Sequence, residues 1–296
     1  MKSAYCFGHI STGKLYKIEG SFPHANGYAE YTEILDNYAG EALSSSLVLR
    51  RLGIPTILEG NWIGDNEDGR KTLEFIRKND ITLGNVHIQP GYAGVNEIVI
   101  SDATTRTVFG RYCDLLFTTR QWEMPTPNFI KKAGVITVDP SFGEASIVVA
   151  EYAKKYSIPF VSIDAPYDSI LISNSKITII SEDFILQKYP EIPLEELFKR
   201  YLNHCNGLVI FTFGSAPLWY GRTEKCEMPV FTVPVVDTAG AGDSFRAGIM
   251  YGILKEMDDF SMIQFANAVA ASVIQTSPGV VNFKGINEVN KILNSI

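Results

Sequence analysis

The 296-residue chain lacks most of the features that mark membrane, secreted or nucleic-acid-binding proteins. No apolar run reaches the roughly 18 residues that a membrane helix needs. The N-terminus has no basic stretch followed by an apolar run and a small-residue cleavage site. Lys and Arg number 26 against 33 Asp and Glu, and the basic residues are scattered. We therefore expect no membrane and no nucleic-acid partner, and a cytoplasmic location.

Cysteine and histidine are both scarce, with four residues of each. No two of the four cysteines have the spacing of a zinc or redox motif, which favours free thiols; they are Cys6, Cys113, Cys205 and Cys226. The four histidines are too dispersed to indicate a metal site; they are His9, His24, His87 and His204. Internal repeats and low-complexity segments are missing too, so the composition is that of an ordinary globular protein.

Two kinds of sequence segment alternate along most of the chain. Short β-branched or aromatic runs predict strands at 3–7, 55–59, 135–138, 160–163, 176–180, 208–213 and 231–236. Segments of helical period predict helices at 41–52, 69–78, 144–156, 194–203, 244–255, 262–276 and 286–293. The alternation predicts one α/β domain over 1–296, with a doubly wound, mostly parallel sheet and helices on both faces. Ligands of such sheets bind at the carboxyl ends of the strands.

Two regions interrupt this rhythm. Residues 11–38 contain Gly20, Pro23, Gly27 and several Tyr without helical period, and residues 86–112 contain two strand-like runs around a turn at 102–104. We expect both to be β excursions that together form a small sheet serving as a lid. Exposed edges of such a sheet favour a homodimer through the lid, because unpaired strands find partners.

Residues 237–243, Asp-Thr-Ala-Gly-Ala-Gly-Asp, carry the strongest chemical signal. A Gly-Ala-Gly run at a helix start lets backbone N–H groups converge on an anion, so the amides of Gly240, Ala241 and Gly242 are candidates for an anion hole. Asp243, in the first turn of that helix, could accept the proton of an attacking hydroxyl while the amides stabilise a transferring phosphoryl group. The simpler alternative is a glycine turn with Asp243 as a helix N-cap.

This segment, continued by Ser-Phe-Arg-Ala-Gly at 244–248, resembles the signature of the ribokinase family, the phosphofructokinase-B (PfkB) carbohydrate kinases. The segments 39–42, 51–53, 60–65 and Gly69 are similar to further family landmarks, so the likeness spans nearly the whole chain. The resemblance implies a ribokinase-like fold with a β lid. It implies ATP and Mg²⁺ as cofactors, often with a monovalent cation such as K⁺, and phosphorylation of a sugar hydroxyl, in most cases a primary one.

The resemblance also implies roles for individual residues. Thr212, Gly214 and Ser215 match the nucleotide loop, and Asn267 falls where the family's adenine pocket lies. For the sugar-type substrate it indicates Ser11, Gly40, Ser44, Asn96, Arg106 and Asp139. Asp164 is a further strand-end carboxylate, and the alternative for both it and Asp139 is capping of the following turn. Glu182 would organise Mg²⁺ through water.

The departures from the family concern the substrate and the metal. Gly13 stands where an Asp is usual, Ser44 replaces a sugar-binding Asn, and the Asn-x-x-Glu segment aligns with Ser-Glu-Asp-Phe at 181–184. This pattern points to an unusual substrate, and it leaves open a fructoselysine-like kinase, suggested by residues 106–112, a nucleoside kinase or a non-catalytic binding homologue. The Gly-x4-Gly-Lys run at 8–14 only imitates a Walker A loop, since Leu15 replaces its Ser or Thr and no helix pattern follows.

Overall fold

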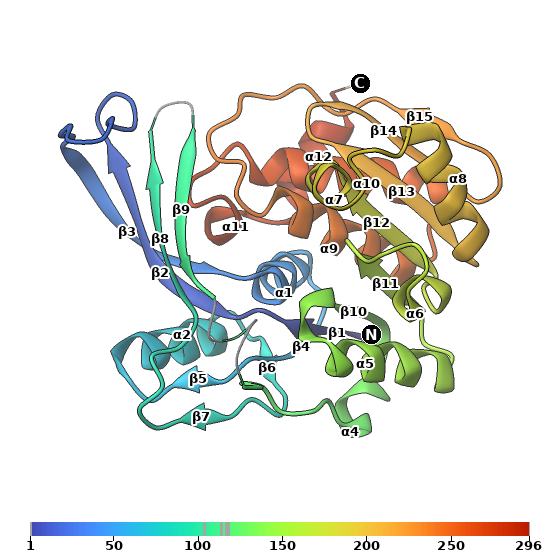
Figure 1. Ribbon diagram of the computed structural model, residues 1–296, viewed down its shortest axis with the longest axis horizontal. Helices are drawn as coiled ribbons and strands as arrows, with labels where there is room; N and C mark the ends of the chain where they lie inside the picture. The colour runs from blue at the N-terminus through green and yellow to red at the C-terminus, as the bar shows by residue number, and fades with distance from the viewer. Residues whose placement is uncertain (1, 103–104, 113–114, 116–118, 296) are drawn as a thin grey trace.

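The computed structural model describes residues 2–102, 105–112, 115 and 119–295. Within them the main sheet has nine strands in the order β15-β14-β13-β12-β11-β10-β1-β4-β6 (Figure 1). Its strands are β1 Ser3–Gly8, β4 Thr56–Gly60, β6 Thr82–Leu83, β10 Ala133–Val138, β11 Phe160–Ile163, β12 Ile177–Ser181, β13 Leu208–Phe213, β14 Ala216–Gly221 and β15 Cys226–Met228. Pairing is parallel from β13 to β6, while β14 and β15 are antiparallel. The predicted α/β class is confirmed.

Helices cover both faces of this sheet. On one side are α1 Glu41–Arg51, α2 Glu67–Lys78, α9 Ala241–Leu254, α10 Asp259–Val273, α11 Gly279–Asn282 and α12 Ile286–Leu293. On the other are α4 Pro127–Ile130, α5 Glu144–Lys155, α6 Ile170–Ser173, α7 Glu182–Lys188 and α8 Leu194–His204, together with the short 3₁₀ turn η1 Pro140–Phe142.

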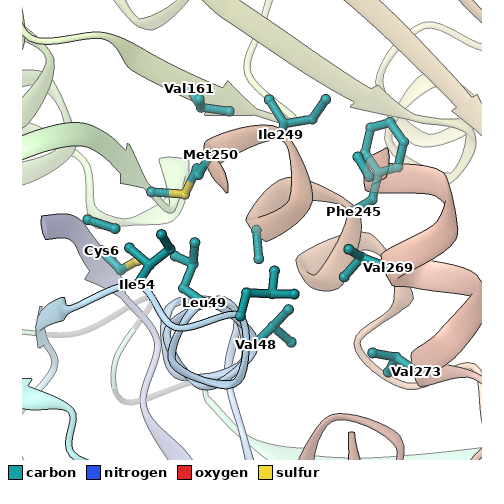
Figure 2. Close-up of a cluster of buried hydrophobic side chains, with 14 of the residues drawn as sticks. Cys6, Val48, Leu49, Ile54, Val161, Phe245, Ile249, Met250, Val269 and Val273 are labelled. Carbon is teal, nitrogen blue, oxygen red and sulfur yellow. The ribbon is translucent and has the colours of Figure 1, made fainter. Parts of the chain in front are cut away.

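Each side of the sheet has its own apolar core. Strand β1 shows why: alternate residues point to opposite faces, so Cys6 joins one core and Phe7 the other. Figure 2 shows the first core, where Cys6 of β1 and Val48 and Leu49 of α1 gather with side chains of α9 and α10. Burial on both faces explains the continuous apolar strands.

A second, smaller sheet stands beside the main one. Strands β2 Ser11–Ile18, β3 Tyr31–Ala39, β8 Asn96–Ser101 and β9 Arg106–Arg111 pair in the order β3-β2-β8-β9. They project from the main body at the left of Figure 1. Strand β2 starts soon after β1 ends, and β3 leads into α1, so the small sheet is tied to two elements of the main domain. The short strands β5 Ile63–Gly64 and β7 Ile88–Gln89 pair separately.

The strand expected at 231–236 does not form, and that prediction is wrong. The edge beside β13 is occupied by β14 and β15 instead. Pro234 has no N–H for a ladder, and the side chains of Val235 and Val236 are exposed. The Val236 and Asp237 amides donate to the Ile274 carbonyl, which fastens this stretch to the end of α10. In addition, α9 starts at Ala241, three residues before the expected 244.

Among the described residues, no helix is both long enough and apolar enough to span a membrane.

Candidate active site

The site is organised by the turn that leads into α9. The Asp237 carboxylate accepts hydrogen bonds from the Ala239 amide at 2.9 Å and from the Gly279 amide at 3.3 Å. Gly240, the N-cap residue, has φ 74°, a left-handed conformation in which a side chain would be strained. The hydrogen bonds to Asp237 and the left-handed conformation of Gly240 together fix the turn.

The amides at this helix start differ in what they contact. The Ala241 N–H donates to the Thr238 carbonyl at 3.3 Å, so it is already engaged. Among the described residues, the N–H groups of Gly240, Gly242 and Asp243 have no hydrogen-bond acceptor within the chain. First-turn amides of a helix attract anions because the helix dipole adds positive potential there. The predicted anion hole therefore loses Ala241 as a free donor and gains Asp243.

Asp243 lies in the first turn of α9, with its side chain 15% exposed. One carboxylate oxygen, Oδ1, accepts a hydrogen bond from Arg246 Nη2 at 3.1 Å. The other, Oδ2, lies 4.0 Å from where a Cβ on Gly240 would be. Burial raises the pKa of Asp243 to about 8, although the Arg246 guanidinium opposes this rise. Such a carboxylate is suited to proton acceptance near neutral pH.

Arg246 connects Asp243 to Asp139. Its guanidinium donates to Asp139 Oδ1 at 2.7 Å, while Asp139 Oδ2 accepts the His9 backbone N–H at 2.8 Å. Burial raises the pKa of Asp139, and the charge of Arg246 lowers it. Asp139, which follows β10, is thus a buried ion-pair partner of Arg246.

His9, Glu41 and Asp139 form a group in which one ligand atom from each lies within 4.8 Å of the others. His9 Nδ1 is 2.7 Å from the Glu41 carboxylate. Burial lowers the pKa of His9, but Glu41 outweighs burial and the pKa is raised. This group contains one histidine and two carboxylates, and none of the other three histidines belongs to it. Both oxygens of Asp139 are already hydrogen-bonded, however, and a guanidinium adjoins them, so the group does not fit a cation.

Two cavities meet at Asp243. The first, of about 410 Å³, lies between the small sheet and the starts of α1 and α9. Its wall includes His9, Leu15, Asn37, Tyr38, Gly40, Glu41, Ser44, Glu97, Val99, Arg106, Val108, Tyr112, Asp237, Gly240, Asp243 and Gly279. We name it the acceptor cavity.

The second cavity, of about 500 Å³, lies at the carboxyl ends of β11, β12 and β13. Its wall includes Asp164, Ser181, Glu182, Asp183, Thr212, Gly214, Gly240, Ala241, Gly242, Asp243, Phe245 and Asn267. We name it the donor cavity. Of the residues that the structure describes, four line both cavities: Glu41, Arg106, Gly240 and Asp243. A group held in one cavity can therefore reach a group held in the other at the Asp243 carboxylate.

The structure distributes the predicted site residues unevenly. Gly40, Ser44 and Arg106 line the acceptor cavity. Thr212, Gly214, Asn267 and Glu182 line the donor cavity. Ser11, Asn96, Asp139 and Ser215 line neither.

Physical reasons account for three of these four exceptions. Ser11 is 1% exposed at the base of β2, and Asp139 is committed to Arg246. Asn96 is followed by Glu97, whose side chain takes the opposite face of β8 and reaches the cavity.

Asp164 holds Ser181, the last residue of β12. Its two carboxylate oxygens accept from the Ser181 amide at 2.7 Å and the Ser181 hydroxyl at 2.9 Å. Burial raises the pKa of Asp164, and these hydrogen bonds oppose the rise. Asp164 therefore binds the end of the neighbouring strand β12, which differs from the predicted capping of the turn that follows Asp164 in the chain. In this way it helps to position the start of α7 beside the donor cavity. Lys14, in the stretch that imitates a Walker A loop, pairs with Asp36 on the small sheet.

Glu97 is the main residue of the acceptor cavity that sequence reasoning missed. It is 8% exposed, and its carboxylate accepts from Asn37 Nδ2 at 2.6 Å and from the Tyr112 hydroxyl. Burial raises its pKa, while the bond from Tyr112 opposes this. The available signal was its position between Val95 and Val99 on the buried face of a strand, where an acid is unusual.

A basic carboxylate, free helix-start amides and two cavities that meet beside them define a site for transfer of an anionic group between two bound molecules. Residues 1–282 match the model of the "pfkB family carbohydrate kinase" domain. This chain belongs to the pfkB family of carbohydrate kinases, which are ATP-dependent phosphotransferases.

Individual relatives agree with that assignment. The chain is 23% identical over 245 residues to a ribokinase of Lactococcus lactis, covering 80% of this chain and 79% of the relative. It is 23% identical over 296 residues to a nucleoside kinase of Methanothermobacter thermautotrophicus, covering 96% and 93%. Among solved structures, Arabidopsis thaliana ribokinase complexed with ribose and ATP superimposes with a TM-score of 0.80 at 16% identity, covering 99% and 98%. The last likeness shows a shared fold.

Proposed function

We propose that this protein transfers the γ-phosphoryl group of ATP to a primary hydroxyl of a sugar or sugar derivative. The observation that carries the proposal is the meeting of the two cavities at Asp243. The donor cavity holds ATP, with Thr212, Gly214 and Asn267 in its wall. The acceptor cavity holds the alcohol.

In this mechanism Asp243 Oδ2 accepts the proton of the attacking hydroxyl. The amides of Gly240, Gly242 and Asp243 stabilise the charge that develops on the transferring phosphoryl group. Arg106, which lines both cavities, adds a positive charge at their junction. The small sheet covers the acceptor as a lid, which limits hydrolysis of ATP by water.

The acidic residues of the donor cavity fit a magnesium ion. Glu182 and Asp183 begin α7 and line the cavity, and their carboxylates form no ion pair with another of the described residues. Carboxylates and waters are the ligands that Mg²⁺ prefers. When bound with ATP, Mg²⁺ would neutralise phosphate charge. We retain K⁺ as an accessory cation on the family resemblance alone.

A nucleoside is the second candidate acceptor. Leu15, Val99 and Val108 give the acceptor cavity an apolar wall, which suits a flat base better than a free sugar. The similarity to the Methanothermobacter nucleoside kinase supports the same reading. Fructosamines remain candidates, because Glu97 offers a carboxylate to an amine. The use of ATP favours the cytoplasm.

The proposal is tested by ADP release with Mg-ATP and potassium over pentoses, ketohexoses, sugar phosphates, fructosamines and nucleosides. Acceptor-dependent release identifies the substrate class. Absence of release with every acceptor, combined with thermal stabilisation by sugars or nucleotides, would instead indicate a non-catalytic binding protein.

Glu97→Gln is expected to lower kcat/KM for the acceptor by about 10- to 100-fold and to leave the KM for ATP unchanged. Glu97 lines only the acceptor cavity, and loss of a charged hydrogen-bond acceptor costs about 1.5–3 kcal/mol. Thr212→Val is the matched control, because Thr212 lines only the donor cavity and should affect ATP alone. Steady-state kinetics with each substrate varied would separate the two effects. Equal effects of Glu97→Gln on both substrates would contradict the assignment.

We also propose that two copies pair through the outer face of the small sheet. Ile34, Ile98 and Phe109 are 45%, 48% and 53% exposed there, and Ile98 lies opposite Phe109 in the β8–β9 ladder. Exposed apolar side chains on an open sheet favour association. Sedimentation velocity at micromolar concentration should show a dimer that Phe109→Glu dissociates. A monomer for the unaltered protein would remove this proposal.

A further inference from the structure

Arg246 is completely buried, with 0% of its side chain exposed. Arginine is almost never buried to this extent unless its charge is paired. Its guanidinium donates to Asp139 Oδ1 at 2.7 Å, to Asp243 Oδ1 at 3.1 Å, to Ser45 Oγ at 3.0 Å and to the Glu41 carbonyl at 2.5 Å. One side chain therefore joins the helix that carries the base to two other segments.

Those two segments form the surroundings of the base. Glu41 and Ser45 belong to the start of α1, which walls the acceptor cavity, and the Ser45 hydroxyl also donates to the Asp243 carbonyl at 3.2 Å. Asp139 follows β10 and is held in turn by the His9 amide. Because Arg246 contacts Asp243 through Oδ1, the carboxylate is oriented with Oδ2 toward Gly240.

We propose that Arg246 and Asp139 are positioning residues that orient the Asp243 carboxylate and set how readily it takes a proton. Arg246 holds Oδ1 and favours the ionised form, which leaves Oδ2 for the hydroxyl of the acceptor. Asp139 pairs with the same guanidinium, so its negative charge weakens the preference of Asp243 for the ionised form. The expected change in the pH dependence of kcat rests on the proposed function, whereas the expected change in the pKa of Asp243 does not.

The charges around Asp243 predict opposite effects of removing the two partners. Burial raises the pKa of Asp243 to about 8, Arg246 lowers it, and both Glu41 and Asp139 raise it. The charged and titratable groups that face it from the packed elements are Arg246 on α9, Glu41 on α1, Asp139 after β10, Cys6 on β1, His9 after β1 and Arg106 on β9. Loss of the guanidinium should raise the pKa of Asp243 further. Loss of the Asp139 charge should lower it.

The test is the pH dependence of kcat in Arg246→Met, Arg246→Lys and Asp139→Asn. In the unaltered enzyme the rate should rise with pH as Asp243 loses its proton. The rise should move about one to three pH units higher in Arg246→Met, since opposite charges at this distance shift a pKa by that amount. It should move lower in Asp139→Asn and stay closer to the unaltered position in Arg246→Lys. Arg222→Met removes an exposed pair with Asp259 and should leave the profile unchanged.

A second readout does not require activity. Carbon-13 NMR of aspartate carboxyls, with the Asp243 signal identified by its loss in Asp243→Asn, should show the same opposite shifts. If Arg246→Met fails to fold, Asp139→Asn still supplies a signed prediction. Identical titration of Asp243 in folded Asp139→Asn and in the unaltered protein, or a shift to higher pH, would overturn the inference. Shifts as predicted in a protein without kinase activity would refute the proposed function alone.

Discussion

Asp243→Asn is expected to lower kcat by about 100- to 10,000-fold, which is the usual contribution of a positioned general base. The amide is almost isosteric with the carboxylate, and Arg246 keeps its shorter ion pair to Asp139. ATP binding should change little, because the helix-start amides and the donor cavity are unaltered. Single-turnover kinetics and ATP titration would measure the two quantities separately.

The same variant should not lose stability. A carboxyl with a folded-state pKa of about 8, against roughly 3.9 when unfolded, binds its proton more tightly in the native state. Its ionisation therefore destabilises the fold as the pH rises from about 4 to 8, and asparagine removes that dependence. Melting temperatures of the unaltered protein and of Asp243→Asn, measured across this pH range, would show the difference.

An appropriate control for these effects is Asp168→Asn, an exposed aspartate that lines neither cavity. It should leave the rate and the pH dependence as they are. Near-normal turnover by Asp243→Asn would exclude the general-base role.

Gly242→Val is expected to lower kcat/KM for ATP by about 100-fold or more without unfolding the protein. A Cβ at Gly242 would meet no atom within 4 Å, so packing does not require a glycine at this position. The residue is nevertheless exposed in the wall of the donor cavity, where its amide is free. A valine side chain would keep phosphate away from that amide, and loss of one such donor costs about 100- to 1,000-fold.

Gly242→Ala supplies a graded comparison, with a smaller side chain at the same place. Its effect should be intermediate, while its melting temperature should match or exceed that of the unaltered protein, since alanine favours helix over glycine. ATP affinity by calorimetry and the melting temperature would be recorded for both variants. Normal ATP kinetics in Gly242→Val would show that the phosphates lie elsewhere.

How far the sequence predicted this site depended on how local each feature is. The run at 237–243 lies within one turn and one helix start. Apart from the bonds that join Asp237 to Ile274 and Gly279, its geometry follows from neighbouring residues. The bond from Arg246 to Asp139 spans 107 positions, and the bond from Asn37 to Glu97 spans 60. Local patterns contain no information about such partners, which is why Asp139 was expected to contact substrate and Glu97 was missed.

The fold showed the same division. Strands β1, β10, β11 and β13 are buried on both faces, and their apolar runs indicated them to within about two residues. The run at 231–236 has the same composition but contains Pro234, and the sheet edge is instead filled by β14 and β15. Composition described the preference of a segment, whereas competition for a sheet edge depends on the whole chain.

Arg106 belongs to the small sheet and lines both cavities. A displacement of that sheet would therefore change the surroundings of the nucleotide and of the alcohol together. Binding free energies linked in this way are reciprocal. If the bound alcohol changes the affinity for the nucleotide by some factor, the bound nucleotide changes the affinity for the alcohol by the same factor. The two ligands of this kinase would then report on each other's occupancy through a single guanidinium on the small sheet.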